Sequence, residues 1–153
     1  MTTLLIRRLR VEELPETMEL VLRVFMEFEA PEYSQEGVEE FKRFIAVEAM
    51  EPPLRSGERP VWCCVEDGKI VGMIALRDKS HVCLLFVDKA YQRRGIARAL
   101  FEAASQGLAT MTVFSSPYAV EAYRHLGFVP TDTEQTVNGL RFTPMRYERA
   151  TAV

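Results

Sequence analysis

The sequence predicts an α/β fold in which a mixed sheet of about seven strands is flanked by about four helices. Three observations predict it. The dipeptides Asp67-Gly68 and Asn138-Gly139 each separate two apolar runs, as the turns of two-residue β-hairpins do. Several other segments carry apolar residues at the spacing of amphipathic helices. An apolar run from Val82 to Val87 leads through a turn into a helix-like run that begins at Gly95.

The first 60 residues are predicted to form one strand and two helices. Leu4 to Arg10 is strand-like, and Glu12 to Glu29 carries apolar residues at helical spacing. A second helix is expected from Ser34 to Met50, with the Ser34 side chain as its N-cap. Residues 51–60 are rich in proline, so we expect a loop there.

The middle of the chain predicts three antiparallel strands and a helix. The strands are Val61 to Glu66, Lys69 to Arg77 and His81 to Val87, and Asp67-Gly68 forms the turn between the first two. The helix is expected from Gly95 to Gln106.

The C-terminal part predicts a strand, a helix and a hairpin. The strand runs from Thr110 to Phe114, and the helix extends from the N-cap Ser116 to Gly127, which is expected just past its end. The hairpin strands are Phe128 to Val137 and Leu140 to Tyr147. Pro144 lacks an N–H donor, so it implies a bulge or a strand end within the last run.

Composition excludes several classes of protein. The chain of 153 residues is long enough for a substantial core, and we expect a single domain over residues 1–153. Its 48% apolar and 27% charged residues are typical of soluble globular proteins, and a net charge of −3 argues against nucleic-acid binding. No apolar run approaches the ~20 residues that span a bilayer, and no signal-peptide layout begins the chain. The sequence therefore predicts a cytoplasmic protein without a membrane partner.

Charge is unevenly distributed along the chain. Residues 1–60 contain 13 acidic and 8 basic residues, whereas residues 61–153 contain 9 acidic and 11 basic residues. This distribution suits an anionic cofactor at the second part and a cationic or amine substrate at the first. Solvated, Glu-rich helix faces would explain the same acidic excess.

Cysteine and histidine patterns give no sign of a metal site. Cys63, Cys64 and Cys83 lack C-x-x-C spacing and lie in apolar runs, so we expect reduced, buried or half-buried thiols. His81 and His125 are the only histidines, and they fit no metal-binding motif. We therefore predict that no metal is bound.

The most informative segment runs from Val87 to Leu100. It joins a strand to a helix N-terminus, where free backbone N–H groups and the helix dipole favour a phosphate or pyrophosphate. Gly95 allows a positive φ and a close backbone approach, and Ala97 leaves the first helical turn unobstructed. An ordinary strand-to-helix turn would show the same local pattern.

Two motifs carry a resemblance that extends over almost the whole chain. Gln92-x-x-Gly95-x-Ala97 resembles the Q/R-x-x-G-x-G/A acetyl-CoA loop of the GCN5-related N-acetyltransferase (GNAT) superfamily. The segment 116–128 is similar to its second signature, N-x-x-A-x-x-x-Y-x-x-x-G-F, with Tyr123 in register and Ser116 in place of the usual Asn. The resemblance implies a twisted, mostly antiparallel GNAT-like sheet in which the strand that ends at Val87 carries a bulge.

The resemblance also implies roles for individual residues. Acetyl-CoA would be held by strand backbone, by the loop and helix start, and by a residue beside the second motif. These cofactor-binding residues are Leu85, Phe86, Val87, Gln92, Arg93, Arg94, Gly95, Ile96, Ala97, Arg98 and Ser116. Tyr123 would be catalytic, because a tyrosine with a pKa of ~10 stays protonated at pH 7 and can donate its proton to the thiolate leaving group.

The implied reaction is transfer of an acetyl group from acetyl-CoA to a primary amine of a small molecule or peptide, by direct attack in a ternary complex. The general base is open between Glu27, Glu29, a water chain and an amine that binds already neutral. A non-catalytic acyl-CoA-binding or regulatory module is the alternative. The hairpin around Asn138-Gly139 would form either a substrate wall or dimer contacts, so a homodimer is compatible with the sequence.

Overall fold

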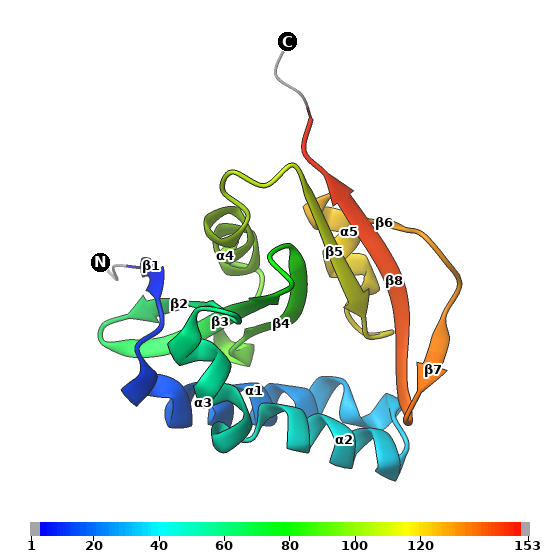
Figure 1. Ribbon diagram of the computed structural model, residues 1–153, viewed down its shortest axis with the longest axis horizontal. Coiled ribbons are helices and arrows are strands. Elements are labelled where there is room, and N and C mark those ends of the chain that lie inside the picture. Colours follow the sequence, from blue (N-terminus) through cyan, green and yellow to red (C-terminus); the bar gives the residue numbers. More distant parts are fainter. Residues whose placement is uncertain (1–3, 151–153) are drawn as a thin grey trace.

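The structure is a computed structural model that describes residues 4–150. Over these residues it has eight strands and five α-helices, arranged as a sheet with helices on both faces (Figure 1). The strands are β1 (Leu4–Arg8), β2 (Val61–Glu66), β3 (Lys69–Arg77), β4 (His81–Val87), β5 (Thr110–Ser115), β6 (Val129–Pro130), β7 (Gln135–Val137) and β8 (Leu140–Glu148). The helices are α1 (Leu14–Phe28), α2 (Gln35–Ile45), α3 (Val47–Ser56), α4 (Ile96–Ala104) and α5 (Val120–Leu126).

The sheet is mixed and mostly antiparallel, as predicted, and it opens between β4 and β5. Its strand order is β1-β2-β3-β4-β5-β8-β6, and β7 also pairs with β8. The parallel pair β4–β5 is joined only at His81–Thr112 and Val82–Val113. Beyond Val82 the two strands diverge, which gives the sheet the split seen in Figure 1.

A bulge in β4 begins this divergence. Ala75 of β3 pairs with Leu84 and Leu76 pairs with Val82, so Cys83 is an extra residue with no partner opposite it. As a result Cys83 and Leu84 both pack toward the side of α1, whereas Val82 packs on the opposite face. A bulge bends a strand and increases its twist, and this one turns the second half of β4 away from β5.

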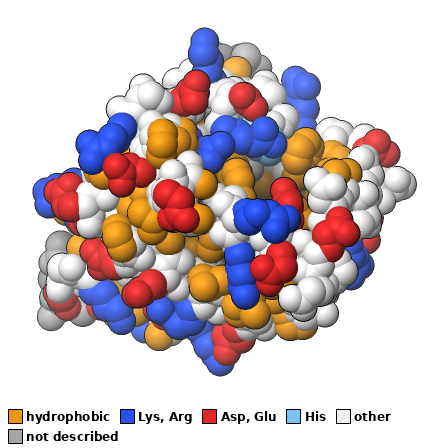
Figure 2. Space-filling view, turned by 60° about the horizontal axis from the view of Figure 1, so that its bottom comes forward, with side chains coloured by type: hydrophobic (Ala, Val, Ile, Leu, Met, Phe, Trp, Pro, Cys, Tyr) orange, Lys and Arg blue, Asp and Glu red, His pale blue; other side chains and the backbone are white. Residues whose placement is uncertain are grey.

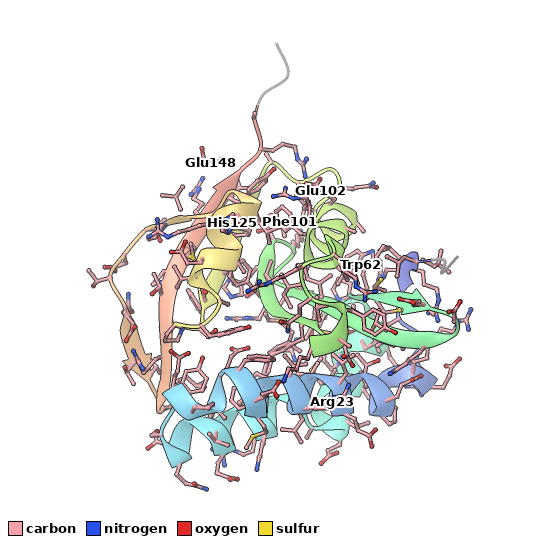
Figure 3. The ribbon with its side chains drawn as sticks, turned by 180° about the vertical axis from the view of Figure 1, so that it is seen from behind. Arg23, Trp62, Phe101, Glu102, His125 and Glu148 are labelled. Carbon is pink, nitrogen blue, oxygen red and sulfur yellow. The ribbon has the colours of Figure 1, made fainter. Side chains whose placement is uncertain are left out.

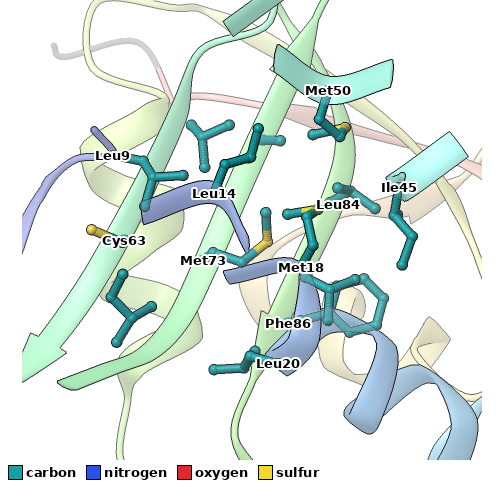
Figure 4. Packing of buried hydrophobic residues seen from close by; sticks show 14 of the residues in the cluster. Leu9, Leu14, Met18, Leu20, Ile45, Met50, Cys63, Met73, Leu84 and Phe86 are labelled. Atoms are coloured by element: carbon teal, nitrogen blue, oxygen red, sulfur yellow. The ribbon is translucent and has the colours of Figure 1, made fainter. Parts of the chain in front are cut away.

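Two apolar clusters hold the layers together. On one face, Leu14 and Met18 of α1 pack with Met73, Leu84 and Phe86 of the sheet (Figure 4). Burial of each such side chain contributes about 1.5–3 kcal/mol. The other face is covered by α4 and α5, which lie side by side on the sheet (Figure 3).

The predicted second helix and the loop after it were wrong. Ala46 takes an extended conformation (ψ 138°) and divides the segment, so α2 ends at Ile45 and α3 includes Pro52 and Pro53. Proline inside a helix is costly because it removes an N–H donor. Here the fully buried Met50 anchors the helix, and Gly57 ends it in the left-handed conformation (φ 83°), so tertiary packing outweighs the local preference.

The C-terminal predictions also need correction. The run Phe128 to Val137 forms two short strands, because Asp132 accepts from the Thr133 N–H at 2.7 Å and makes a local turn between them. Pro144 causes neither a bulge nor a strand end. Its carbonyl accepts from the Thr131 N–H at 2.9 Å, so its backbone nitrogen also points away from β5, where no hydrogen bond of the β5 ladder is lost.

The remaining local predictions are largely confirmed. Asp67-Gly68 and Asn138-Gly139 form hairpin turns with positive φ at both residues. Ser34 accepts from the Gly37 N–H at 3.2 Å as the N-cap of α2. Within residues 4–150, no helix is long and apolar enough to cross a membrane.

Candidate functional site

The second half of β4 presents free backbone groups where β5 has diverged. The Asp88 N–H donates to the Val71 carbonyl of β3 at 2.8 Å. Backbone groups alternate in direction along a strand, so those of Leu85 and Val87 face the open side, whereas those of Phe86 face β3. Gln92 Nε2 donates to the Val87 carbonyl at 3.1 Å and ties the following loop to this strand.

The loop after β4 adds a run of unpaired N–H groups at the start of α4. Within residues 4–150, no backbone N–H from Arg93 to Arg98 has an acceptor, and the first helical bond is from Ala99 to Gly95 at 3.0 Å. Arg93 (φ 65°) and Gly95 (φ 79°) are both left-handed, which turns successive N–H groups toward one side. We call residues 85–98 the β4 edge, which can bind both an extended chain and a phosphate group.

The three arginines of this edge have different surroundings. Arg98 donates to the carbonyl of His125 at the end of α5, whose position is labelled in Figure 3. Arg94 lies over the ring of Tyr91, 5.1 Å from its centre. Arg98 therefore holds α4 against α5, and Arg93 and Arg94 are the arginines better placed to contact an anion.

A cavity of about 470 Å³ lies beside this edge, at the split in the sheet. It is lined by the end of α1, by α2, by β4 with the bulge at Cys83, by the start of α5 and by the β7–β8 hairpin. We call it the central cavity. Figure 2 shows the helix side of the molecule, where the surface is hollowed beside Lys and Arg side chains.

Tyr123 lines the central cavity and is held firmly. Gly127 (φ 108°) ends α5 in the left-handed conformation, and the Phe128 N–H donates to the Tyr123 carbonyl at 3.0 Å. The Phe128 ring packs edge-on against that of Tyr123, with centroids 5.3 Å apart. Burial, together with the nearby Glu29 carboxyl, raises the pKa of Tyr123 well above its usual value, so its hydroxyl stays protonated at neutral pH.

Glu29 also lines the cavity, directly after α1. Burial raises the pKa of its carboxyl to about 7; a hydrogen bond from Ser116 opposes this rise, and the nearby Glu32 carboxyl adds to it. A group with this pKa is half ionised at neutral pH and can accept a proton there. Glu27 does not line the cavity, since its carboxylate binds the Lys89 ammonium at 3.0 Å on the outer surface.

Ser116 is buried, and it does not begin α5 as predicted. Its hydroxyl accepts from the Ala119 N–H at 3.2 Å, closing a turn before α5 starts at Val120. The Ser116 side chain is also close enough to Glu29 to lower the pKa of that carboxyl. Of the residues expected at the cofactor, those from 85 to 98 share the β4 edge, whereas Ser116 lies outside it. Leu85, Phe86 and Ser116 line the central cavity.

Two other titratable groups in the cavity are poorly suited to acid–base or nucleophilic chemistry at neutral pH. Burial, assisted by Arg77, lowers the pKa of His81 to about 4, and its Nδ1 lies 2.9 Å from the Thr112 hydroxyl. Burial raises the pKa of the Cys83 thiol to about 11. Cys63, Cys64 and Cys83 are all free thiols, as expected.

The β7–β8 hairpin forms a wall of the cavity because its turn packs directly on α2. A side chain at Gly37 would place its Cβ 2.2 Å from the Gly139 carbonyl oxygen, so the backbones touch. Arg141 strengthens the contact by donating to the Glu32 carbonyl at 3.2 Å. Asn138 lines the cavity from this turn.

Several lining residues were not predicted from the sequence, among them Phe41, Phe44 and Arg59. The two phenylalanines follow the helical period of α2, and that pattern indicates only a buried face. Arg59 lies in a segment predicted to be a loop. Only the packing of α2 on β4 and α3 brings them to one cavity.

Comparisons with known proteins give the class. The family model described as the acetyltransferase (GNAT) domain matches residues 29–149, so the chain belongs to the GNAT acetyltransferases. A search of the curated proteins found no match. Among residues 4–150, no group of three or more His, Cys, Asp or Glu side chains could hold a metal ion.

Solved structures share the fold over nearly the whole chain. A GCN5-related N-acetyltransferase from Rhodopseudomonas palustris is 22% identical with a TM-score of 0.79, and 96% of each chain is covered. The PaiA N-acetyltransferase from Thermoplasma acidophilum, in complex with coenzyme A, is 18% identical with a TM-score of 0.81, covering 96% of this chain and 99% of that one. Apo-form YjaB from Escherichia coli is 24% identical with a TM-score of 0.72, covering 95% and 97%.

Proposed function

We propose that this GNAT acetyltransferase transfers an acetyl group from acetyl-CoA to a primary amine of a small molecule or peptide, by direct attack in a ternary complex. One observation carries the proposal. The central cavity, with Tyr123 and Glu29 in its lining, also includes Leu85 and Phe86 of the β4 edge. An amine in the cavity could thus meet an acyl group held along β4.

The β4 edge suits acetyl-CoA in two parts. The outward backbone groups of Leu85 and Val87 can pair with the pantetheine amides, and an N–H there can polarise the acetyl carbonyl. The free N–H groups from Arg93 to Arg98 suit the pyrophosphate, and Arg93 and Arg94 add charge. Support comes from the coenzyme A complex of the Thermoplasma relative, which shares this fold.

Glu29 and Tyr123 divide the proton transfers. Glu29 takes a proton from the acceptor ammonium, which frees the nitrogen lone pair to form the new N–C bond. Tyr123 gives its hydroxyl proton to the sulfur as the C–S bond breaks, and its phenolate then takes the second proton from the nitrogen, which leaves a neutral amide and a free CoA thiol. Glu29 is preferred to Glu27 as the base because it faces the cavity and its pKa lies near neutral pH.

Two measurements test the proposal. Isothermal titration should show that the chain binds acetyl-CoA, and a thiol-release assay with a panel of primary amines should show turnover above hydrolysis. Binding with no release for any amine would support the alternative, a non-catalytic acyl-CoA-binding module. Failure to bind acetyl-CoA would reject both.

A further inference from the structure

The central cavity contains a cation that no acidic side chain of residues 4–150 neutralises. Arg59 lines the cavity and forms no salt bridge within that part of the chain. The other two arginines of the lining are paired, Arg77 with Asp78 at 3.3 Å and Arg141 with Glu134 at 3.0 Å. Arg59 is therefore the arginine of the cavity lining whose charge no carboxylate of the described residues balances.

The donors of Arg59 are also poorly satisfied. Its guanidinium lies over the Phe44 ring, 4.8 Å from the centre, and Nη1 is 3.8 Å from the sulfur of Met50. Nε is buried with no acceptor in the described residues, and Nη2 has none but is not buried. Buried donors in native proteins nearly always have partners, and a guanidinium forms its strong bidentate hydrogen bonds with carboxylates and phosphates. The arrangement fits an anionic ligand group in the cavity.

The backbone holds Arg59 in this place. Its N–H donates to the Pro53 carbonyl at 3.0 Å, and the Pro60 carbonyl accepts from the Leu76 N–H at 3.1 Å. The residue is thus fixed between α3 and β3. These bonds order its backbone, and stacking on Phe44 restrains its guanidinium, which lowers the entropy cost of binding a ligand.

Arg59 and the reacting groups belong to one continuous wall. Arg59, Cys83 at the β4 bulge and Tyr123 all line this one cavity. The rings of Phe41, Phe44 and Phe114 supply apolar lining. The cavity therefore has a proton-transfer end at Tyr123 and Glu29, a cationic end at Arg59, and aromatic surface.

Apart from Glu29, the acidic residues of the first 60 bring little unpaired charge to this cavity. Glu40 also lines the cavity, but its carboxylate is paired with Arg43 at 2.7 Å. His81 is neutral at pH 7, since burial lowers its pKa to about 4. A polyamine would bring a second cation toward Arg59, and like charges repel in such a site.

We propose that the acceptor is an amine that also carries a carboxylate on a compact apolar body, an amino-acid-like compound, and that Arg59 binds the carboxylate. This inference rests on the proposed function and narrows its substrate class. Arg59 is a specificity residue for the acceptor and takes no part in proton transfer.

The test compares acceptors that differ only at the carboxylate. One set is L-phenylalanine, its amide and phenethylamine; the other is 4-(aminomethyl)benzoate, its amide and 4-methylbenzylamine. At saturating acetyl-CoA, wild type should show kcat/KM roughly 10- to 100-fold higher for a carboxylate than for its neutral analogues, as expected for a charged hydrogen bond. Arg59→Gln should bring this ratio close to one, and Arg59→Lys should restore part of it.

Arg55→Gln is the matched control, because Arg55 is exposed, pairs with Glu51 at 3.0 Å and does not line the cavity. It should keep the wild-type ratio, and thermal unfolding should show all variants folded. Equal rates across each set, an unchanged ratio in Arg59→Gln, or turnover of spermidine but of no carboxylate would overturn the inference, and so would turnover of none of the panel by a protein that binds acetyl-CoA. Absence of acetyl-CoA binding would instead reject the proposed function.

Discussion

The β4 edge and the central cavity lie next to each other, yet they are built in different ways. Residues 85–98 are contiguous, and their free N–H groups follow from local conformation at Arg93 and Gly95. The cavity takes residues from the segment after α1, from α2, from the segment before β2, from the β4 bulge and from the β7–β8 hairpin. The edge can therefore be recognised as a motif, whereas the cavity exists only after the chain has folded. Four substitutions can break or sharpen this contrast.

Tyr123→Phe should have the largest effect. Loss of the proton donor should lower kcat by about 10²- to 10⁴-fold, while the acetyl-CoA Kd stays near wild type because Tyr123 lies outside the β4 edge. Stopped-flow or thiol-release kinetics and isothermal titration measure the two quantities. Tyr147→Phe is the control, since Tyr147 packs in the same apolar cluster but does not line the cavity. Unchanged kcat in Tyr123→Phe would remove Tyr123 from the mechanism.

Glu29→Gln should lower kcat by about 10²-fold near neutral pH, because the base is lost. In wild type, kcat should rise with pH through about 7 as Glu29 ionises, and this step should vanish in the variant. Glu27→Gln, two residues earlier in the chain, is the matched control, as Glu27 pairs with Lys89 outside the cavity. If Glu27→Gln removed the step and Glu29→Gln did not, the assignment of the base would be wrong.

Glu29→Gln also tests a prediction about the pH dependence of stability. A carboxyl whose pKa is raised from 4.5 to about 7 binds its proton more tightly in the folded chain. Its ionisation therefore destabilises the fold increasingly as pH rises between those values, and the full cost is present above about 7. Glu29→Gln should gain on the order of 2 kcal/mol over wild type between pH 5 and pH 8, measured by urea unfolding. A constant difference would show that Glu29 has an ordinary pKa.

Gly37→Ala should affect the cavity and leave the β4 edge intact. The added Cβ would meet the Gly139 backbone, so the hairpin must move, at a cost of about 1–3 kcal/mol. We expect acceptor kcat/KM to fall about tenfold and the acetyl-CoA Kd to stay unchanged. A weaker acetyl-CoA Kd with normal acceptor kinetics would contradict the separation of the two regions.

Gly95→Ala should have the smallest effect of the four, and it should weaken acetyl-CoA binding while leaving the central cavity intact. Alanine at φ 79° costs about 1–2 kcal/mol, although nothing lies within 4 Å of the added Cβ. Relaxation of the loop should weaken acetyl-CoA binding by about fivefold, seen by titration. Gly68→Ala is the control, with φ 80° and the same open surroundings in the β2–β3 turn. It should lose similar stability and keep normal affinity; equal loss of affinity in both would contradict a specific role of Gly95.

Local patterns in the sequence determined much of the fold and one side of the candidate site. The turns at Asp67-Gly68 and Asn138-Gly139, the glycines that precede α4 and follow α5, and the spacing of Tyr123 all depend on neighbours in the chain. For the same reason, the β4 edge could be outlined residue by residue. Steric and hydrogen-bonding requirements that involve only a few adjacent residues can be predicted from the sequence.

Tertiary structure alone decided the rest. Burial of Met50 made a helix of a segment with two prolines, and backbone direction let Pro144 lie inside β8. The sequence could not decide whether Glu27 or Glu29 is the better candidate base. In the folded chain, burial raises the pKa of Glu29, whereas Glu27 lies on the surface and pairs with Lys89. Arg59 could be proposed as a ligand-binding residue only because the folded structure places no counter-ion beside it within residues 4–150. Burial, charge pairing and desolvation depend on residues distant in sequence, so they appear only when the chain is folded.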